Sequence, residues 1–232
     1  MRLPIYQVDA FTDKLFGGNP AAICPLETWL PDATMQAVAA ENNLSETAFL
    51  VREVDEYALR WFTPSVEVDL CGHATLASAH VVFSCLEPQR ESVRFRTLKA
   101  GTLVVSRRSG MLTMDFPARP AAPCEAPAGL LAALGGTPRE ALCARDHLVV
   151  YGSAAEIAAH GFGRARAGRL LGRDRHRAGR GRRGLCFAFL CSGPGRAGGS
   201  GDRLGPHHAR ALLGETPVGG QAVTFLVGHI EL

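Results

Sequence analysis

A thiol and an imidazole stand two residues apart in the first half of this sequence. Cys71 and His73 flank Gly72, where a turn opens onto an apolar run of helical length. A glycine at a helix start lets the backbone approach a ligand closely, and the free N–H groups of the first helical turn attract anions. The tripeptide therefore predicts a site for a small carboxylate, beside groups that can transfer protons.

The elements around this tripeptide have clear sequence signals. The aromatic and aliphatic run Tyr57–Phe62 predicts a strand before it, and Ala74–Phe83 predicts a helix after it. A carboxylate and a hydroxyl, Glu46 and Ser45, lie at the mouth of another predicted strand, Leu44–Val51. These elements must bring the polar residues together if they form one site.

The rest of the first half predicts one more helix and several strands. Asp32 is placed to cap a helix over Ala33–Glu41, whose apolar face contains Met35, Val38 and Ala39. Alternation and turn residues predict strands over Pro4–Phe11, Ala21–Cys24, Val93–Thr97, Thr102–Ser106 and Met111–Phe116. This mixture of elements is typical of an α+β protein.

The composition fits one large globular domain or two small ones. The chain has 232 residues, of which 47% are hydrophobic, and this is ample for a buried core. No apolar run approaches the length of a membrane span, and the N-terminus looks like a strand rather than a signal peptide. Seven cysteines without regular spacing predict no disulfide framework, so we expect a reducing, cytoplasmic compartment.

The second half begins regularly and then changes character. Proline-rich Pro117–Pro127 predicts a linker, followed by a helix near Ala128–Leu134, a strand over His147–Tyr151 and a capping box formed by Ser153 and Glu156. Residues 160–210 then hold twelve arginines and two acidic residues, a net charge of +10, against −7 for the rest of the chain. This tract has almost no apolar periodicity and cannot bury a core as it stands.

Regular sequence returns over Gly220–Leu232, which predicts two short strands around Gly228. The arginine-rich tract before it has a possible role in binding nucleic acid. However, single-strand binders interleave aromatic residues for base stacking, and none occurs between Phe162 and Phe187. We therefore expect no specific nucleic-acid partner. The histidines and cysteines of this region lack metal-ligand spacing, so we also expect no metal site.

Several motifs of the first half occur together, in the order and with the spacing of one known family. They are Asp9-Ala10-Phe11, Gly18-Asn19-Pro20, Asn43-Leu44-Ser45-Glu46-Thr47, Phe62-Thr63-Pro64 and Gly72-His73-Ala74-Thr75. On these residues the chain is similar to the PhzF-like proteins, the phenazine biosynthesis isomerase family, which share the diaminopimelate epimerase fold. The resemblance covers roughly residues 1–155, and the closing GQAVTFLVGHIEL looks like the family's last strands.

The resemblance implies two similar domains, each a curved mixed sheet around a central helix, with the active site in the cleft. We expect an N-terminal domain over residues 1–118, carrying Glu46 and the CGHAT motif. A C-terminal domain is then expected over 119–232, incomplete or disordered at about 160–215. We also expect a small carboxylated substrate, no membrane association and, if the chain self-associates, a homodimer.

The resemblance also implies roles for individual residues in a cofactor-independent proton transfer. Glu46 matches the family's acid/base glutamate, and the substrate-binding residues would be Asn19, Ser45, Cys71, Gly72, His73, Ala74 and Thr75. Cys71 stands where related epimerases and racemases carry one of two catalytic cysteines. Each role has a simpler alternative: Glu46 as a solvated carboxylate, His73 as a helix cap, Cys71 as a small buried side chain and Asn19 as a turn residue.

The family's second-half motif, near EDPVTGSAH, is absent from the sequence. A shift of one base across Arg196–Ala209 gives VPEDPVTGSAHTTL, and all fourteen first bases that the residues force agree with it. The same shift turns Arg173–Arg183 into VIVTAPGEGDE. We therefore hypothesise that residues from about 160 to 212 are a frameshifted reading. The chain is then an impaired isomerase or epimerase, or alternatively a catalytically inactive remnant or non-enzymatic binding protein.

Overall fold

The structure is a computed structural model, and it describes residues 1–117, 120–126, 131, 134–135, 137–143, 146–151, 184–185 and 218–232. The chain divides into two compact units, one formed by Met1–Pro117 with Thr216–Leu232 and the other by Ala118–Glu215. The division falls beside the end of the first predicted domain. In this division the last residues of the chain belong to the first unit, whereas the predicted second domain runs over 119–232.

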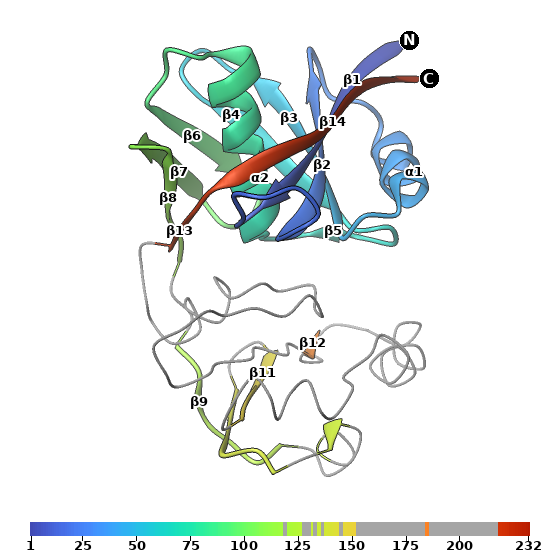
Figure 1. The fold of residues 1–232 in the computed structure, drawn as a ribbon. Helices are drawn as coiled ribbons and strands as arrows, with labels where there is room; N and C mark the ends of the chain where they lie inside the picture. The colour runs from blue at the N-terminus through green and yellow to red at the C-terminus, as the bar shows by residue number, and fades with distance from the viewer. Residues whose placement is uncertain are drawn as a thin grey trace. The chain divides into compact units, whose positions relative to one another are not determined.

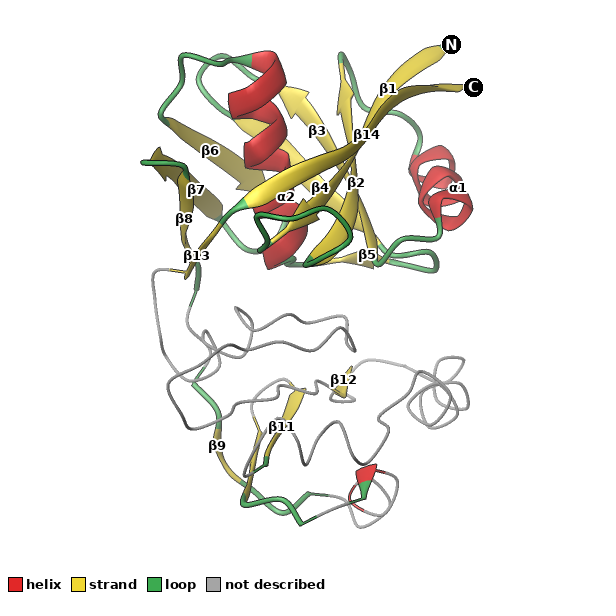
Figure 2. Ribbon diagram, viewed as in Figure 1, coloured by secondary structure: helices red, strands yellow, loops and turns green. Residues whose placement is uncertain are grey.

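The first unit is built on a ten-stranded mixed sheet, drawn in yellow in Figure 2. The strands are β1 (Arg2–Ala10), β2 (Asn19–Leu26), β3 (Glu46–Arg52), β4 (Tyr57–Phe62), β5 (Glu67–Val68), β6 (Ser92–Thr97), β7 (Thr102–Arg108), β8 (Met111–Asp115), β13 (Val218–Gly220) and β14 (Ala222–Glu231). Their order is β13-β8-β7-β6-β4-β3-β2-β1-β14, and β5 pairs with β4.

The C-terminal segment joins the two ends of this sheet. β13 pairs with β8 at one end, β14 pairs with β1 at the other, and a single residue, Gln221, separates the two strands. Both chain termini therefore lie side by side (Figure 1). The prediction of two short strands around Gly228 is wrong, since β14 runs unbroken and pairs Gly228 with Ile5. Closure of this kind removes exposed sheet edges, which are prone to aggregate.

Helix α2 (Gly72–Val81) lies inside the curved sheet and contacts β1, β2, β3, β8 and β14 (Figure 1). Nine of its ten residues are buried, as expected for a helix that is apolar on all sides. It continues as a π-helical segment, η1 (Val82–Leu86). The helix begins two residues before the predicted Ala74, so Gly72 and His73 belong to its first turn. The predicted architecture of a curved mixed sheet around a central helix is confirmed for this unit.

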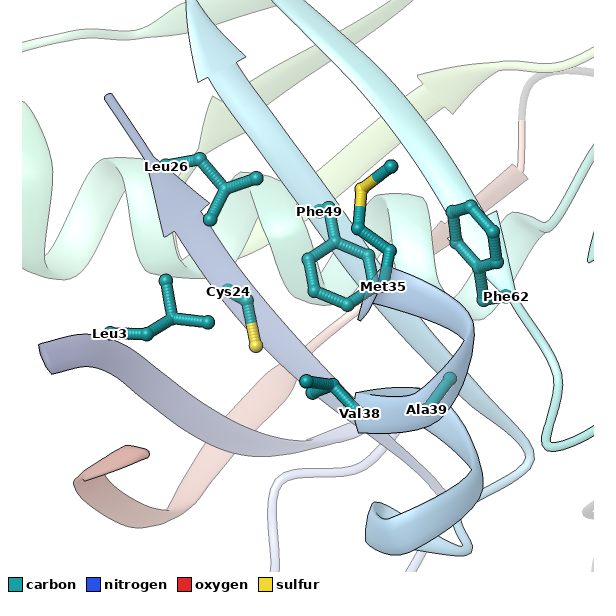
Figure 3. Packing of buried hydrophobic residues seen from close by; sticks show 8 residues of the cluster. All are labelled: Leu3, Cys24, Leu26, Met35, Val38, Ala39, Phe49 and Phe62. Atoms are coloured by element: carbon teal, nitrogen blue, oxygen red, sulfur yellow. The ribbon is translucent and has the colours of Figure 1, made fainter. Parts of the chain in front are cut away.

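Helix α1 (Asp32–Asn42) packs on the opposite face of the sheet. Its predicted apolar face is confirmed, because Met35, Val38 and Ala39 are buried. They pack with residues from four strands in a cluster of Leu3, Cys24, Leu26, Met35, Val38, Ala39, Phe49 and Phe62 (Figure 3). The helix ends at Asn42, and Asn43 follows it as the C-cap with a left-handed φ of 48°.

The predicted cap of α1 is wrong. Pro31 occupies the N-cap position, and Asp32 is the first helical residue with no side-chain capping bond. The Asp32 carboxylate instead accepts a hydrogen bond from Arg60 Nη1 at 2.8 Å. An ion pair with a neighbouring strand has replaced the local hydrogen bond that the sequence favoured.

The second unit contains a four-stranded sheet in the described residues, with the order β12-β11-β10-β9. The strands are β9 (Ala122–Pro123), β10 (Glu140–Cys143), β11 (Asp146–Val150) and β12 (Gly184–Leu185). β11 confirms the predicted strand near 147–151, whereas β9 shows that the predicted linker is partly a strand. A disulfide joins Cys124 to Cys143, although the cysteine spacing had predicted no disulfide framework. The antiparallel pairing of β9 and β10 brings them together, with Cα atoms 5.8 Å apart.

Three predictions concern residues that the structure describes only in part or not at all. The helix near 128–134 is described only in part, the capping box of 153 and 156 lies outside the described residues, and so does most of the predicted irregular segment 160–215. In the described part of the chain, no helix is both long and apolar enough to cross a bilayer.

Candidate active site at the start of helix α2

Glu46, His73 and Cys71 meet where β3 begins and α2 begins. The Glu46 carboxylate oxygen Oε2 lies 3.1 Å from His73 Nε2, and Cys71 Sγ lies 3.4 Å from His73 Nδ1. All three residues are buried, with 7%, 2% and 5% of their surfaces exposed for Glu46, His73 and Cys71. The structure therefore assembles the carboxylate, imidazole and thiol that the sequence singled out.

The imidazole connects the other two groups, one at each ring nitrogen. Such a chain of carboxylate, imidazole and thiol can pass a proton along its length, because every neighbour is within contact distance. It also explains how a histidine tolerates nearly complete burial: both ring nitrogens have polar neighbours. The alternative reading of His73 as a simple helix cap does not account for its contact with Glu46.

The charges in this cluster follow from burial and mutual contact. Burial by itself would lower the pKa of His73, but its interactions with Cys71 and Glu46 outweigh that effect and raise the pKa to about 10. Burial, followed by the nearby Glu46 charge, raises the pKa of the Cys71 thiol. The raised pKa of the thiol favours its protonated form near neutral pH, and the contacts with Cys71 and then Glu46 favour an imidazolium at His73.

The same three residues form a set of possible metal ligands, with one donor atom from each within 4.8 Å of the others. Zinc accepts nitrogen, sulfur and oxygen donors of these types. However, Glu46 and Cys71 approach opposite nitrogens of one imidazole ring. An ion bound at either nitrogen would be turned away from one of the other two ligands, so the observed arrangement suits proton transfer better than metal binding.

Asn19 lies on the neighbouring strand and on the same face of the sheet as Glu46. β2 and β3 are parallel, Ala21 is the partner of Glu46, and Asn19 is two residues before Ala21. The preceding Gly18 has a φ of +65°, and a Cβ there would lie 2.2 Å from the carbonyl oxygen of Ala10. This turn therefore requires glycine, and it fixes where β2 and Asn19 begin.

Asp9 supports the same loop from the side. It is buried, and its Oδ2 accepts a hydrogen bond from the backbone N–H of Phe16 at 3.1 Å. Phe16 itself has a φ of 64°, an uncommon conformation for a bulky residue. Asp9 belongs to the motif Asp9-Ala10-Phe11, and the structure makes it a positioning residue for the loop before Asn19.

The other predicted site residues surround the trio without joining it. Gly72, Ala74 and Thr75 belong to the first turn of α2, and Thr75 donates its hydroxyl hydrogen to the carbonyl of Cys71. This bond gives Thr75 a structural role at the helix start. Ser45 immediately precedes β3 and is partly buried. The structure thus brings three of the predicted residues into contact and places the others nearby in the chain or the sheet.

Comparison with known proteins decides the family. A family model described as phenazine biosynthesis-like protein, PhzC-PhzF, matches residues 8–153. The chain belongs to this family. The match includes every predicted site residue and all of the described first unit except its two ends, so the predicted resemblance is confirmed.

Curated PhzF relatives carry names of isomerases or of phenazine biosynthesis-like proteins. An uncharacterized isomerase of Pseudomonas aeruginosa is 55% identical over 159 residues, covering 68% of this chain and 61% of the relative. The human phenazine biosynthesis-like domain-containing protein is 47% identical over 131 residues, covering 53% of this chain and 45% of the relative. The matched part thus spans about half to three fifths of these relatives' lengths.

Solved structures of the family share the fold. A PhzF-family protein from Enterococcus faecalis is 31% identical with a TM-score of 0.78, covering 100% of both chains. A putative PhzC/PhzF protein from Clostridium difficile is 28% identical with the same TM-score, covering 99% of this chain and 100% of that one. These likenesses confirm the predicted epimerase-like fold class of the PhzF family.

Proposed function

We propose that this PhzF-family chain carries half of an isomerase or epimerase site, which transfers a proton on a small carboxylated metabolite without a cofactor. Glu46 is the acid/base, and His73 with the first turn of α2 holds the substrate's carboxylate. The observation that carries the proposal is the 3.1 Å contact between Glu46 and His73 at that helix start. The isomerase names of the curated relatives support the reaction class.

The chemistry follows from the charges of the site. A carboxylate can remove a proton next to an activating group and return it elsewhere on the substrate. A protonated His73 would hold the substrate anion and balance the charge that develops as the proton leaves. The N–H groups of the first turn of α2 add a partial positive charge at the same place. Cys71, protonated at neutral pH, is a reserve proton donor on the other side of the imidazole.

We further propose that the activity is impaired because residues from about 160 to 212 are a frameshifted reading. The family match ends at residue 153, shortly before the arginine-rich tract begins. The missing EDPVTGSAH motif would supply an acidic residue and an anion loop from the second domain. With one half of the site only, a substrate is not clamped from both sides, and most of the benefit of precise positioning is lost.

The second candidate is a non-enzymatic protein that keeps only the first half of the site. It is favoured by the same missing motif. The two candidates differ in what Glu46 does: an isomerase needs its proton transfer, whereas a binding protein needs only its charge or its shape.

The experiment compares three proteins: the chain as it stands, a version with residues 160–212 restored to the alternative frame, and that version with Glu46→Gln. Each is incubated in D₂O with a panel of small carboxylated metabolites, and deuterium uptake at carbon is followed by ¹H NMR. We expect uptake with the restored version, at least about 100-fold less after Glu46→Gln, and little or none with the chain as it stands. Glu41→Gln, at an exposed glutamate of α1, is the matched control.

Two results would overturn the proposal. Uptake by the restored version that survives Glu46→Gln would remove Glu46 from the chemistry. Uptake by the chain as it stands, lost on Glu46→Gln, would show that residues 160–212 are not needed and would contradict the impairment.

A further inference from the structure

A buried tryptophan beside the candidate site has a hydrogen-bond donor without a partner. Trp61 is 2% exposed, and its indole nitrogen Nε1 has no hydrogen-bond acceptor among the described residues. The amide nitrogen Nδ2 of Asn19 is also buried, and no residue in the described part of the chain accepts a hydrogen bond from it. Beyond its ion-pair contact with His73, Glu46 Oε2 likewise makes no hydrogen bond with described residues.

The register of the sheet places Trp61 next to Glu46. In the antiparallel pair of β3 and β4, Trp61 lies directly opposite Ala48, which is two residues from Glu46 on the same strand. Side chains alternate between the faces of a sheet, so Glu46, Ala48 and Trp61 share one face. Diagonal neighbours of this kind are within reach of aromatic and long side chains.

That shared face is the one that holds the site. Phe49 and Phe62 alternate with these residues along β3 and β4, and they pack in the cluster around α1 on the opposite face of the sheet (Figure 3). Asn19 lies on the same face as Glu46, because its strand neighbour Ala21 is the partner of Glu46. The two unpartnered donors, Trp61 and Asn19, therefore lie on either side of Glu46, one on β4 and one on β2.

The cost of burying these two donors without acceptors indicates that they gain a hydrogen-bond partner when a ligand binds. A buried donor without a hydrogen bond has lost its contacts with water and destabilises the fold, and native proteins carry few such groups. If Trp61 only filled space in the core, a phenylalanine would do so equally well and would bury no unpaired N–H group. An indole N–H retained beside an acid/base residue is better explained by an acceptor that arrives with a ligand.

We propose that Trp61 is a substrate-binding residue whose indole N–H donates a hydrogen bond to a carboxylate or carbonyl oxygen of the substrate held at Glu46 and the start of α2. This inference rests on the proposed function. It adds a donor on the β4 side to the anion site, with Asn19 on the β2 side. The ligand it fits carries oxygen acceptors on two sides of the carbon from which Glu46 removes a proton.

The chain offers a clean test because it contains two tryptophans only, Trp29 and Trp61. A ¹⁵N-labelled sample of the full chain gives one indole N–H signal for each, assigned with Trp29→Phe. Malonate, a small dicarboxylate, is titrated against this sample, and the neutral malonamide is the matched control ligand. We expect malonate to shift the Trp61 indole proton downfield and saturably, with the same dissociation constant as the amides of Gly72 and His73. Malonamide should bind far more weakly.

A variant pair gives the second measurement. Trp61→Phe keeps an aromatic ring and removes the N–H, and we expect it to weaken malonate binding about tenfold, the usual value of one hydrogen bond to a charged group. Trp29→Phe, at a partly exposed ring over which Arg60 lies, should leave the affinity unchanged.

The outcomes separate the two proposals. If malonate saturates the Gly72 and His73 signals while the Trp61 indole stays still and Trp61→Phe binds equally well, Trp61 has no role and the anion site stands. If none of these signals moves, the anion site of the proposed function fails and the role of Trp61 fails with it.

Discussion

The two ends of helix α2 each hold a histidine, and the surroundings move their proton affinities in opposite directions. At the first turn, contacts with Cys71 and Glu46 overcome the effect of burial and raise the pKa of His73 to about 10. In the last turn of the helix, His80 contacts the hydroxyl of Thr224 on β14 at 3.0 Å. Burial lowers the pKa of His80, and no opposite charge among the described residues offsets this effect.

The difference separates a site from a structural contact. At the first turn of α2, His73 contacts a carboxylate and a thiol, and these contacts favour its charged form. The last turn has a neutral histidine bonded to the strand that closes the sheet. One helix thus carries a functional end and a structural end, and substitutions at the two ends should give different signatures.

The largest expected effect is at the functional end. Glu46→Gln removes one of the two contacts, with Cys71 and Glu46, that favour an imidazolium at His73, so the pKa of His73 should fall by about 2 units. The pH titration of the His73 ring signals by NMR measures it, with Glu41→Gln as the control that leaves the pKa unchanged. An unaltered pKa in Glu46→Gln would show that Cys71 as a thiolate, and not Glu46, holds the proton on His73.

A second prediction concerns alkaline pH. The folded pKa of His73, about 10, lies above its ordinary value of 6.5. Its contribution to stability is therefore complete below pH 6.5 and is lost progressively as the pH rises to about 10. Urea unfolding followed by tryptophan fluorescence reports the first unit alone, since Trp29 and Trp61 both belong to it. Wild type should lose stability over this range, and Glu46→Gln should lose much less; parallel curves would refute the assignment.

The functional end was largely predictable from the sequence. Cys71, Gly72 and His73 are contiguous, and helix-start chemistry depends on neighbours in the chain, so their type and spacing indicated an anion site. Their contact with Glu46 came from family resemblance and not from spacing, because it depends on how β3 packs against α2.

The structural end was not predictable in the same way. His80 meets Thr224 across 144 positions of sequence, and no local pattern carries information about such a pair. The same limit explains the wrong division of β14 and the wrong cap at Asp32. Gly228 reads locally as a break and Asp32 as a cap, yet pairing with β1 and with Arg60 decided both. Trp61 was predicted as part of a strand, but its unpartnered N–H is a property of packing.

The third prediction tests the link between the helix and the closing strand. Thr224→Val keeps the shape and strand preference of the side chain and removes its hydroxyl, so it should destabilise the first unit by about 1 kcal/mol. Thr102→Val, at an exposed position of β7, is the control with little effect. Loss of tryptophan-detected stability in the control alone would contradict the importance of the contact. The pKa of His73 should stay unchanged in both variants.

The smallest expected effect is a loss of stability in mildly acid solution, caused by His80. It is opposite to the effect of His73, which reduces stability as the pH rises. The folded pKa of His80 lies below 6.5, so the unfolded chain binds more protons in mildly acid solution, and stability falls as the pH drops below 6.5. His80→Gln keeps a polar group of similar reach without a titration, so its stability should fall less than that of wild type between pH 6.5 and 5. The effect is modest because His80 is only partly buried. If His80→Gln instead reduced the loss of stability at alkaline pH, the two histidines would not act independently, and α2 would couple its two ends.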